Sequence, residues 1–256
     1  MRAVSLPVRE RSPRPGGGRH RRPVPTSLPP DAPVLVLACP GDVDSAAAEI
    51  AAVVRVDNPQ IEVRLTAVAH LPSALTEDRA SVVVPLLTWD DPAVLGEIGK
   101  HVAASGAEAA VTEALGPHPL LAEALHIRLA ERGLARADRV RLLNVGSPVD
   151  AVILGTLGGE QAVAAAQPTA VLLASRLTMP VVAASLDSEP GVTVAAERLR
   201  AAGAERLAIA VCSIDAPAGL VEHAAEAIGA GHADPLGAHG AIAELVARAY
   251  GSQLAS

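Results

Sequence analysis

Hydrophobic residues occur in short uninterrupted runs that alternate with longer amphipathic stretches. The first run, Val34-Leu35-Val36-Leu37-Ala38, is apolar on both faces, as expected of a central strand in a parallel sheet. Residues 151–154 could form a short apolar extension of a strand before them. The other runs predict strands over residues 61–68, 81–87, 109–115, 139–145, 180–186 and 207–212, with a short strand near 232–236.

Capping residues mark where the amphipathic stretches begin. Asp44 or Ser45 caps the first stretch, and Asp91 followed by Pro92 opens another. Residues 72–78 read as a loop or a short helix. Helices are predicted over residues 45–54, 92–104, 119–131, 158–175 (interrupted or restarted near Pro168), 193–202, 217–228 and 241–250. Strands that alternate with helices predict right-handed crossovers and parallel sheets, and therefore an α/β fold.

The second half of the chain repeats the first. Leu115-Gly116-Pro117-His118 reappears as Leu236-Gly237-Ala238-His239, and residues 84–93 align with residues 209–218 at a similar offset. Two matches in the same order predict an internal duplication. The expected architecture is two tandem flavodoxin-like or Rossmann-like units with parallel sheets. We place the units at 31–137 and 138–256, behind a tail of residues 1–30.

Composition and charge narrow the class of protein. The tail is rich in Arg, Pro and Gly, so we expect it to be disordered, and it lacks the apolar segment of an export signal. The net charge is −7, and the basic tail leaves an acidic body, which argues against nucleic acid as a partner of the folded part. No run is long enough to span a membrane. Two isolated cysteines suggest reduced thiols and a cytoplasmic protein, of undetermined oligomeric state.

Candidate chemistry falls at the carboxyl ends of the predicted strands, where doubly wound sheets place their sites. His118 and His239 each stand where a strand turns into a helix. They could bind a ligand or metal, or simply fix the turn. Cys39 follows the first strand. It could be a thiolate ligand or nucleophile, but no basic partner is near in sequence, and a small buried residue is the alternative.

Aspartates form a second candidate feature at the same edge. Asp42, Asp44, Asp90 and Asp91 could build an acidic rim that holds a hard divalent cation. Aspartate is also an ordinary helix cap and turn former at such positions. Trp89, the single tryptophan, could be a pocket wall or part of the core.

Three segments resemble the CbiX-like sirohydrochlorin cobaltochelatases and ferrochelatases, which are class II tetrapyrrole chelatases. Residues 34–41 look like the family's first strand and loop, and residues 84–87 look like its Pro-Leu-Leu strand. Residues 115–121 look like its Leu-Gly-x-His-Pro motif. The two-unit form is similar to the long members of that family. The resemblance implies the chelatase-like fold and a role in tetrapyrrole metabolism, towards sirohaem or cobalamin.

The same resemblance exposes a difference in the metal-insertion site. The family uses two histidines that bind Co²⁺ or Fe²⁺ and accept the pyrrole protons. The first position is occupied by Cys39 and the second by about Ala93. The equivalents in the second half are Val145 or Gly146, and Ala218. None of these residues is a histidine, so the resemblance implies a degenerate site.

Three hypotheses follow. The chain could be a CbiX-like homologue that binds a tetrapyrrole or metal, or serves that pathway, without the usual insertion residues. It could instead be a non-catalytic binding or assembly protein on a chelatase scaffold. It could also be an active lyase with a rebuilt site. The candidates are Cys39, His118 and Asp90 for catalysis, Gly41, Trp89, Gly116 and His239 for ligand binding, and Cys39, His70 and His118 for metal. Asp90 and Asp91 would repel the many carboxylates of the family's macrocycle.

Overall fold

The computed structural model describes residues 31–136 and 147–254. The N-terminal unit contains a four-stranded parallel sheet in the order β2-β1-β3-β4. Its strands are β1 (Val34–Cys39), β2 (Val63–Ala67), β3 (Ser81–Pro85) and β4 (Ala109–Val111). Every residue of β1 is buried, which explains why its sequence is apolar on both faces.

The C-terminal unit repeats this topology, with the parallel order β6-β5-β7-β8. Its strands are β5 (Ala151–Thr156), β6 (Val181–Ser185), β7 (Leu207–Val211) and β8 (Gly231–His232). Like β1, the central strand β5 is buried throughout. The predicted α/β fold of two parallel-sheet units is therefore confirmed.

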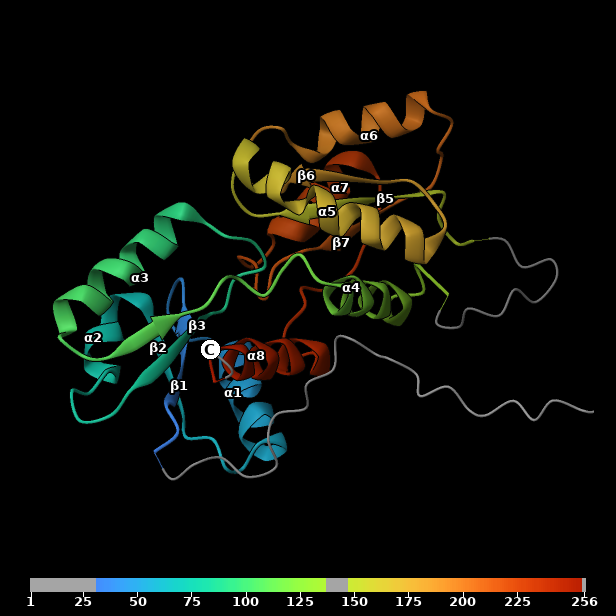
Figure 1. Cartoon of the computed structure of the whole chain (residues 1–256). Coiled ribbons are helices and arrows are strands. Elements are labelled where there is room, and N and C mark those ends of the chain that lie inside the picture. Colours follow the sequence, from blue (N-terminus) through green and yellow to red (C-terminus); the bar gives the residue numbers. More distant parts are fainter. Residues whose placement is uncertain (1–30, 137–146, 255–256) are drawn as a thin grey trace, which may run out of the picture.

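Helices connect the strands in both units (Figure 1). They are α1 (Ser45–Asp57), the short 3-10 helix η1 (Val68–His70), α2 (Leu71–Ala74), α3 (Pro92–Ser105), α4 (Pro119–Glu131), α5 (Glu160–Leu177), α6 (Val192–Ala201), α7 (Leu220–Ile228) and α8 (Gly240–Gln253). The Asp44 carboxylate caps α1, and Asp91 caps α3, which begins at Pro92 as predicted. Within the described ranges, no helix is long and apolar enough to cross a membrane.

Several predicted boundaries were wrong. The prediction of a strand at 139–145 and the expected disorder of residues 1–30 lie outside the described residues. The central strand of the second unit is β5, which the sequence suggested only as an extension. The strands β4 and β8 are shorter than predicted, and each is an edge strand of its sheet. Helix α5 continues through Pro168 without interruption.

The strand register corrects the alignment of the repeats. Ala38 pairs with Pro85 in the first sheet, and Gly155 pairs with Val211 in the second. Val211, one residue later than the sequence match suggested, is therefore the equivalent of Pro85. The equivalent of Cys39, at the end of β1, is Thr156, at the end of β5. It is neither Val145 nor Gly146, which both lie outside the described residues.

The last helix of each unit packs on the other unit. Helix α4 packs against α5 and β7, whereas α8 returns to lie against α1 and β3 (Figure 1). The Tyr250 hydroxyl of α8 donates a hydrogen bond to the carbonyl of Pro33, 2.8 Å away, at the start of the first unit. A boundary near residue 137 remains our proposal for the two units, and these helices cross it.

This exchange produces one continuous core between the sheets. Buried side chains of β1 and β3 join those of β5 and β7 through α1, α4, α5 and α8. The outer faces are covered separately, by α2 and α3 on one sheet and by α6 and α7 on the other. The two units are therefore held in one arrangement by shared hydrophobic packing.

Candidate functional site: a cavity between the two units

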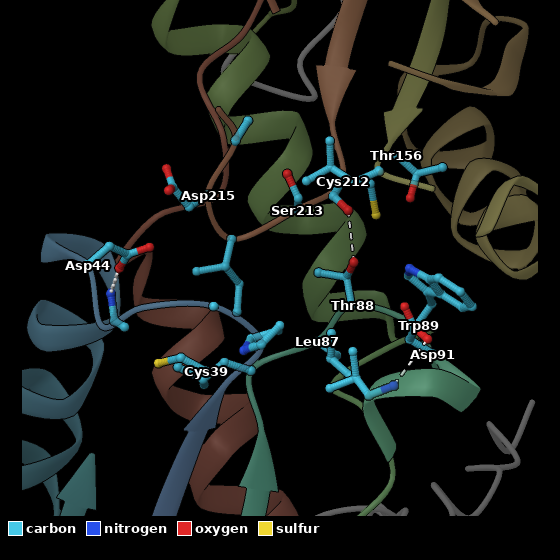
Figure 2. A pocket seen from close by; sticks show the side chains of 18 of the residues that line it. Cys39, Asp44, Leu87, Thr88, Trp89, Asp91, Thr156, Cys212, Ser213 and Asp215 are labelled. Carbon is cyan, nitrogen blue, oxygen red and sulfur yellow. Dashed lines mark hydrogen bonds between the residues drawn. The ribbon is translucent and has the colours of Figure 1, made fainter. Parts of the chain in front are cut away.

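A cavity of about 510 Å³ lies between the units, at the carboxyl ends of the strands. It is lined mainly by the last residues of β1 and β5 and by the segments that follow β1, β3, β5 and β7, which together are residues 39–42, 86–89, 156–157 and 212–217 (Figure 2). Parallel strands bring their carboxyl ends to one edge, and the duplication places two such edges face to face. The position of the cavity therefore follows from the topology.

Contacts between the units form part of the cavity wall. The Thr88 hydroxyl donates a 2.8 Å hydrogen bond to the carbonyl of Cys212, and Figure 2 shows this bond joining the two loops. Trp89 also approaches the second unit, since a Cβ added to Gly158 would lie 3.7 Å from its ring. The side chain of Trp89 lines the cavity. Trp89 could have been a pocket wall or part of the core, and the structure supports the pocket wall.

Some predicted site residues meet here and others do not. Cys39, Gly41 and Trp89 line the cavity. Asp90 and His70 are not among its lining residues. The Asp90 carboxylate instead accepts a hydrogen bond of 2.7 Å from the backbone N–H of Ala114, which ties the loop after β3 to the segment before α4. His70 ends η1, beyond strand β2.

Gly116 is also absent from the cavity lining and has a packing role. A Cβ at this position would lie 2.5 Å from the carbonyl oxygen of Thr88 and 2.8 Å from the Leu121 side chain. Such distances are too short for non-bonded atoms. Only glycine allows the chain before α4 to pass this close to the loop that carries Thr88.

The two repeated histidines act as helix caps. His118 Nδ1 accepts a hydrogen bond from the backbone N–H of Leu120, and His239 Nδ1 accepts one from Ala241, each at 3.1 Å. Neither histidine lines the cavity. An acceptor nitrogen must be unprotonated, so both caps require neutral imidazole. The structure thus favours the turn-fixing interpretation of these residues.

Both environments oppose protonation. Burial and the nearby Arg248 lower the pKa of His118, although Glu244 acts in the opposite direction. Burial and Arg128 likewise lower the pKa of His239, again against nearby glutamates. A base with a lowered pKa in the folded state binds protons more weakly than it does in the unfolded chain. Its contribution to stability is present above the ordinary pKa of 6.5 and is lost as the pH falls below it.

We therefore expect the free energy of unfolding to decrease as the pH falls below the ordinary histidine pKa. The double variant His118→Asn/His239→Asn should flatten this dependence, because asparagine caps helices but does not titrate. His118→Ala and His239→Ala should each lose about 1 kcal/mol above that pKa. Urea unfolding across the pH range measures both effects. A double variant with an unchanged pH dependence would contradict the capping role.

The two cysteines are free and buried, and both line the cavity. Burial, assisted by the negative charge of Asp44, raises the pKa of Cys39 to about 11. Burial raises the pKa of Cys212 to about 12. Both are therefore neutral thiols at neutral pH. Since the thiolate is the nucleophile and the metal ligand, neither cysteine is activated for those roles.

Within residues 31–136 and 147–254, no group of three or more His, Cys, Asp or Glu side chains is arranged to hold a metal ion. The four aspartates of the predicted acidic rim differ in their contacts and in whether they line the cavity. Asp44 and Asp91 cap helices and also line the cavity. Asp42 lines the cavity as well, but Asp90 is engaged by the Ala114 backbone.

Sequence reasoning did not single out three residues that the second unit contributes to the cavity. These residues are Thr156, Cys212 and Ser213. The run Ala151-Val152-Ile153-Leu154 followed by a Gly-rich turn was the signal that could have placed β5 correctly. The Thr88–Cys212 bond has no signal in the sequence, because its partners are far apart in the chain.

Comparisons with known proteins bear on the fold. No protein-family model and no curated protein sequence matches the chain. Among solved structures, the sirohydrochlorin chelatase SirB from Bacillus subtilis subspecies spizizenii, in complex with cobalt, is similar with a TM-score of 0.61. The two chains are 11% identical, over 85% of this chain and 93% of SirB.

Two further structures agree with this. CbiX, described as the terminal enzyme of siroheme biosynthesis in denitrifying bacteria, has a TM-score of 0.59 at 20% identity, over 88% of this chain and 99% of CbiX. A multi-domain Deinococcus radiodurans protein with structural similarity to chelatases has a TM-score of 0.58 at 17% identity, over 86% of this chain and 55% of its own. The predicted resemblance to CbiX-like proteins is confirmed at the level of the fold: this chain has the two-unit chelatase fold.

Proposed function

We propose that this protein binds a tetrapyrrole-like macrocycle in the cavity between its units and does not insert metal into it. The main support for this proposal is the cavity itself. It combines an aromatic wall, Trp89, with apolar side chains, and it has no histidine in its lining. Flat aromatic rings stack favourably on tryptophan. The similar structures SirB and CbiX support the macrocycle as the ligand class.

The loss of metal insertion rests on the chemistry of the lining residues. Insertion of a divalent metal requires groups that bind the ion, here a substrate, and groups that accept two pyrrole protons. The raised pKa of Cys39, about 11, leaves its thiol protonated, so it can do neither at neutral pH. Ala93, at the second family position, has no donor atom. The site is therefore degenerate for the family's reaction, while its shape and aromatic wall remain suited to binding.

The single tryptophan makes the binding claim directly testable. A free-base porphyrin added to the full-length protein should shift its own absorbance and quench Trp89 fluorescence, both saturably and with the same midpoint. Trp89→Leu keeps an apolar side chain but removes the aromatic face, and should weaken binding about tenfold. Val194→Leu, on an exposed face of α6, is the matched control and should bind like the wild type.

Metal insertion is followed separately with sirohydrochlorin and Co²⁺ or Fe²⁺. We expect the absorbance change of insertion to proceed at the rate of a protein-free blank. A rate clearly above the blank would contradict the loss of insertion and favour the rebuilt-site hypothesis. Absence of saturable porphyrin binding would contradict the ligand class and leave a scaffold without a macrocycle.

A further inference from the structure

The cavity has an unusual balance of charge. Its lining includes four carboxylates, two from the first loop of the N-terminal unit, one from the start of α3 and one from the C-terminal unit. These are Asp42, Asp44, Asp91 and Asp215. No lysine, arginine or histidine is among its lining residues. A ligand that enters this space therefore meets negative charge from both units and no positive side chain in the walls.

Two of these carboxylates have structural partners. Asp44 accepts a hydrogen bond of 2.6 Å from the backbone N–H of Ala47, and Asp91 accepts one of 2.9 Å from Ala93. Each charge is partly balanced by the positive end of the helix that it caps. These two aspartates are held in place by the fold, and capping is a sufficient structural reason for their presence.

The other two carboxylates of the cavity lining have no such structural partner. Asp42 and Asp215 are exposed, and neither has a hydrogen bond or an ion pair with any other residue of the described segments. They come from opposite units, and no interaction of the described structure depends on either charge. Both carboxylates line the cavity without a charged partner in the described segments. Screening by water weakens such a field at the surface but does not reverse its sign.

The other lining residues indicate which further chemical groups a ligand should carry. Leu86, Leu87, Leu157 and Ile214 join Trp89 to make most of the surface apolar. One polar atom stands out, because the Oγ of Ser213 is buried and has no hydrogen-bond partner in the described structure. A buried hydroxyl without a partner is costly, and a ligand that offers an amide or carbonyl group could satisfy it.

Together these observations point to the charge of the ligand. We propose that the cavity selects a macrocycle whose substituents are uncharged or cationic, for example with amide groups in place of carboxylates, and discriminates against polycarboxylate rings. This inference rests on the proposed function, because it assigns a chemical class to the ligand of the same site. It runs against the polyanionic substrate that the fold resemblance alone would imply.

A pair of ligands with one ring system tests the idea. Coproporphyrin and its tetra-amide share the macrocycle and differ in four carboxylates. We expect the tetra-amide to bind the full-length protein at least about tenfold more tightly, and the ratio to shrink at high salt because the repulsion is screened. Absorbance titration at low and high salt measures both dissociation constants.

Charge variants identify the origin of the selectivity. Asp42→Asn/Asp215→Asn should tighten coproporphyrin binding several-fold and leave the tetra-amide nearly unchanged. Asp57→Asn removes a negative charge from the far end of α1, about 18 Å along the helix from Ser45, and should change neither constant. Ser213→Ala should weaken only the tetra-amide. All four substituted side chains lack described partners that hold the fold, and thermal unfolding checks that each variant is folded.

The outcomes separate the two proposals. If coproporphyrin binds as tightly as its tetra-amide, or if the double variant leaves the ratio unchanged, the charge selectivity is wrong while macrocycle binding stands. If neither ring binds saturably, macrocycle binding itself is wrong, and the selectivity falls with it. Tighter binding of the tetra-amide together with a reduced ratio in the double variant supports both.

Discussion

Tyr250→Ala is expected to destabilise the protein by about 3–5 kcal/mol, because it removes a large, fully buried side chain from the shared core. Tyr250 attaches α8 to the N-terminal unit. Its ring packs in the cluster that spans both sheets, and its hydroxyl donates to the carbonyl of Pro33. Loss of the ring should therefore weaken the return of the C-terminal helix to the first unit. Urea unfolding of the full chain measures the change.

Two variants refine this result. Tyr250→Phe keeps the ring and should lose only about 1 kcal/mol, the net value of the single hydrogen bond to Pro33. Ser252→Ala changes an exposed residue of the same helix and should stay within about 0.5 kcal/mol of the wild type. If Tyr250→Ala were no more destabilising than Tyr250→Phe, α8 would not be anchored by this side chain.

Gly116→Ala is expected to destabilise the protein by about 2–3 kcal/mol through overpacking. The added Cβ would lie 2.5 Å from a backbone oxygen, which cannot rotate away as a side chain can. The loop of Thr88 would have to move, and Thr88 donates the hydrogen bond to the carbonyl of Cys212 that joins the two units in the cavity wall. We therefore expect a lower midpoint of urea unfolding and an altered fluorescence of the neighbouring Trp89.

Gly99→Ala provides the matched comparison. Gly99 lies inside α3, and an added Cβ would meet nothing within 4 Å. Alanine is the better helix former, so this variant should gain about 0.5–1 kcal/mol. The same chemical change should thus have opposite signs at the two positions. Equal stability of both variants would show that the chain near Gly116 can relax without cost.

The internal repeat separates structural residues from those of the cavity. The two histidine caps make the same hydrogen bond in both units, since each helix start leaves N–H groups that need an acceptor. The cavity positions differ between the units: Cys39 corresponds to Thr156, and Leu87 corresponds to Ser213. The duplicated scaffold therefore encloses an asymmetric cavity, which suits a ligand bound in a single orientation.

The sequence by itself determined the local elements and the class of fold. Runs such as 34–38 are apolar on both faces, and only a strand covered on both sides accommodates them. Asp44, Asp91 and Pro92 defined helix starts because caps act on backbone groups within the same turn. The repeated Leu-Gly-x-His segment revealed the duplication. Each of these signals depends on residues close together in the chain.

Only the tertiary structure decided which sheets α4 and α8 cover and which residues share the cavity. An apolar helix face fits either of two similar sheets, so the amphipathic patterns of α4 and α8 could not reveal that they cross between units. His118 looked the same in sequence whether it capped a helix or faced a ligand. Thr88 and Cys212 meet only because the units dock, and contacts of that kind depend on the packing of the whole core.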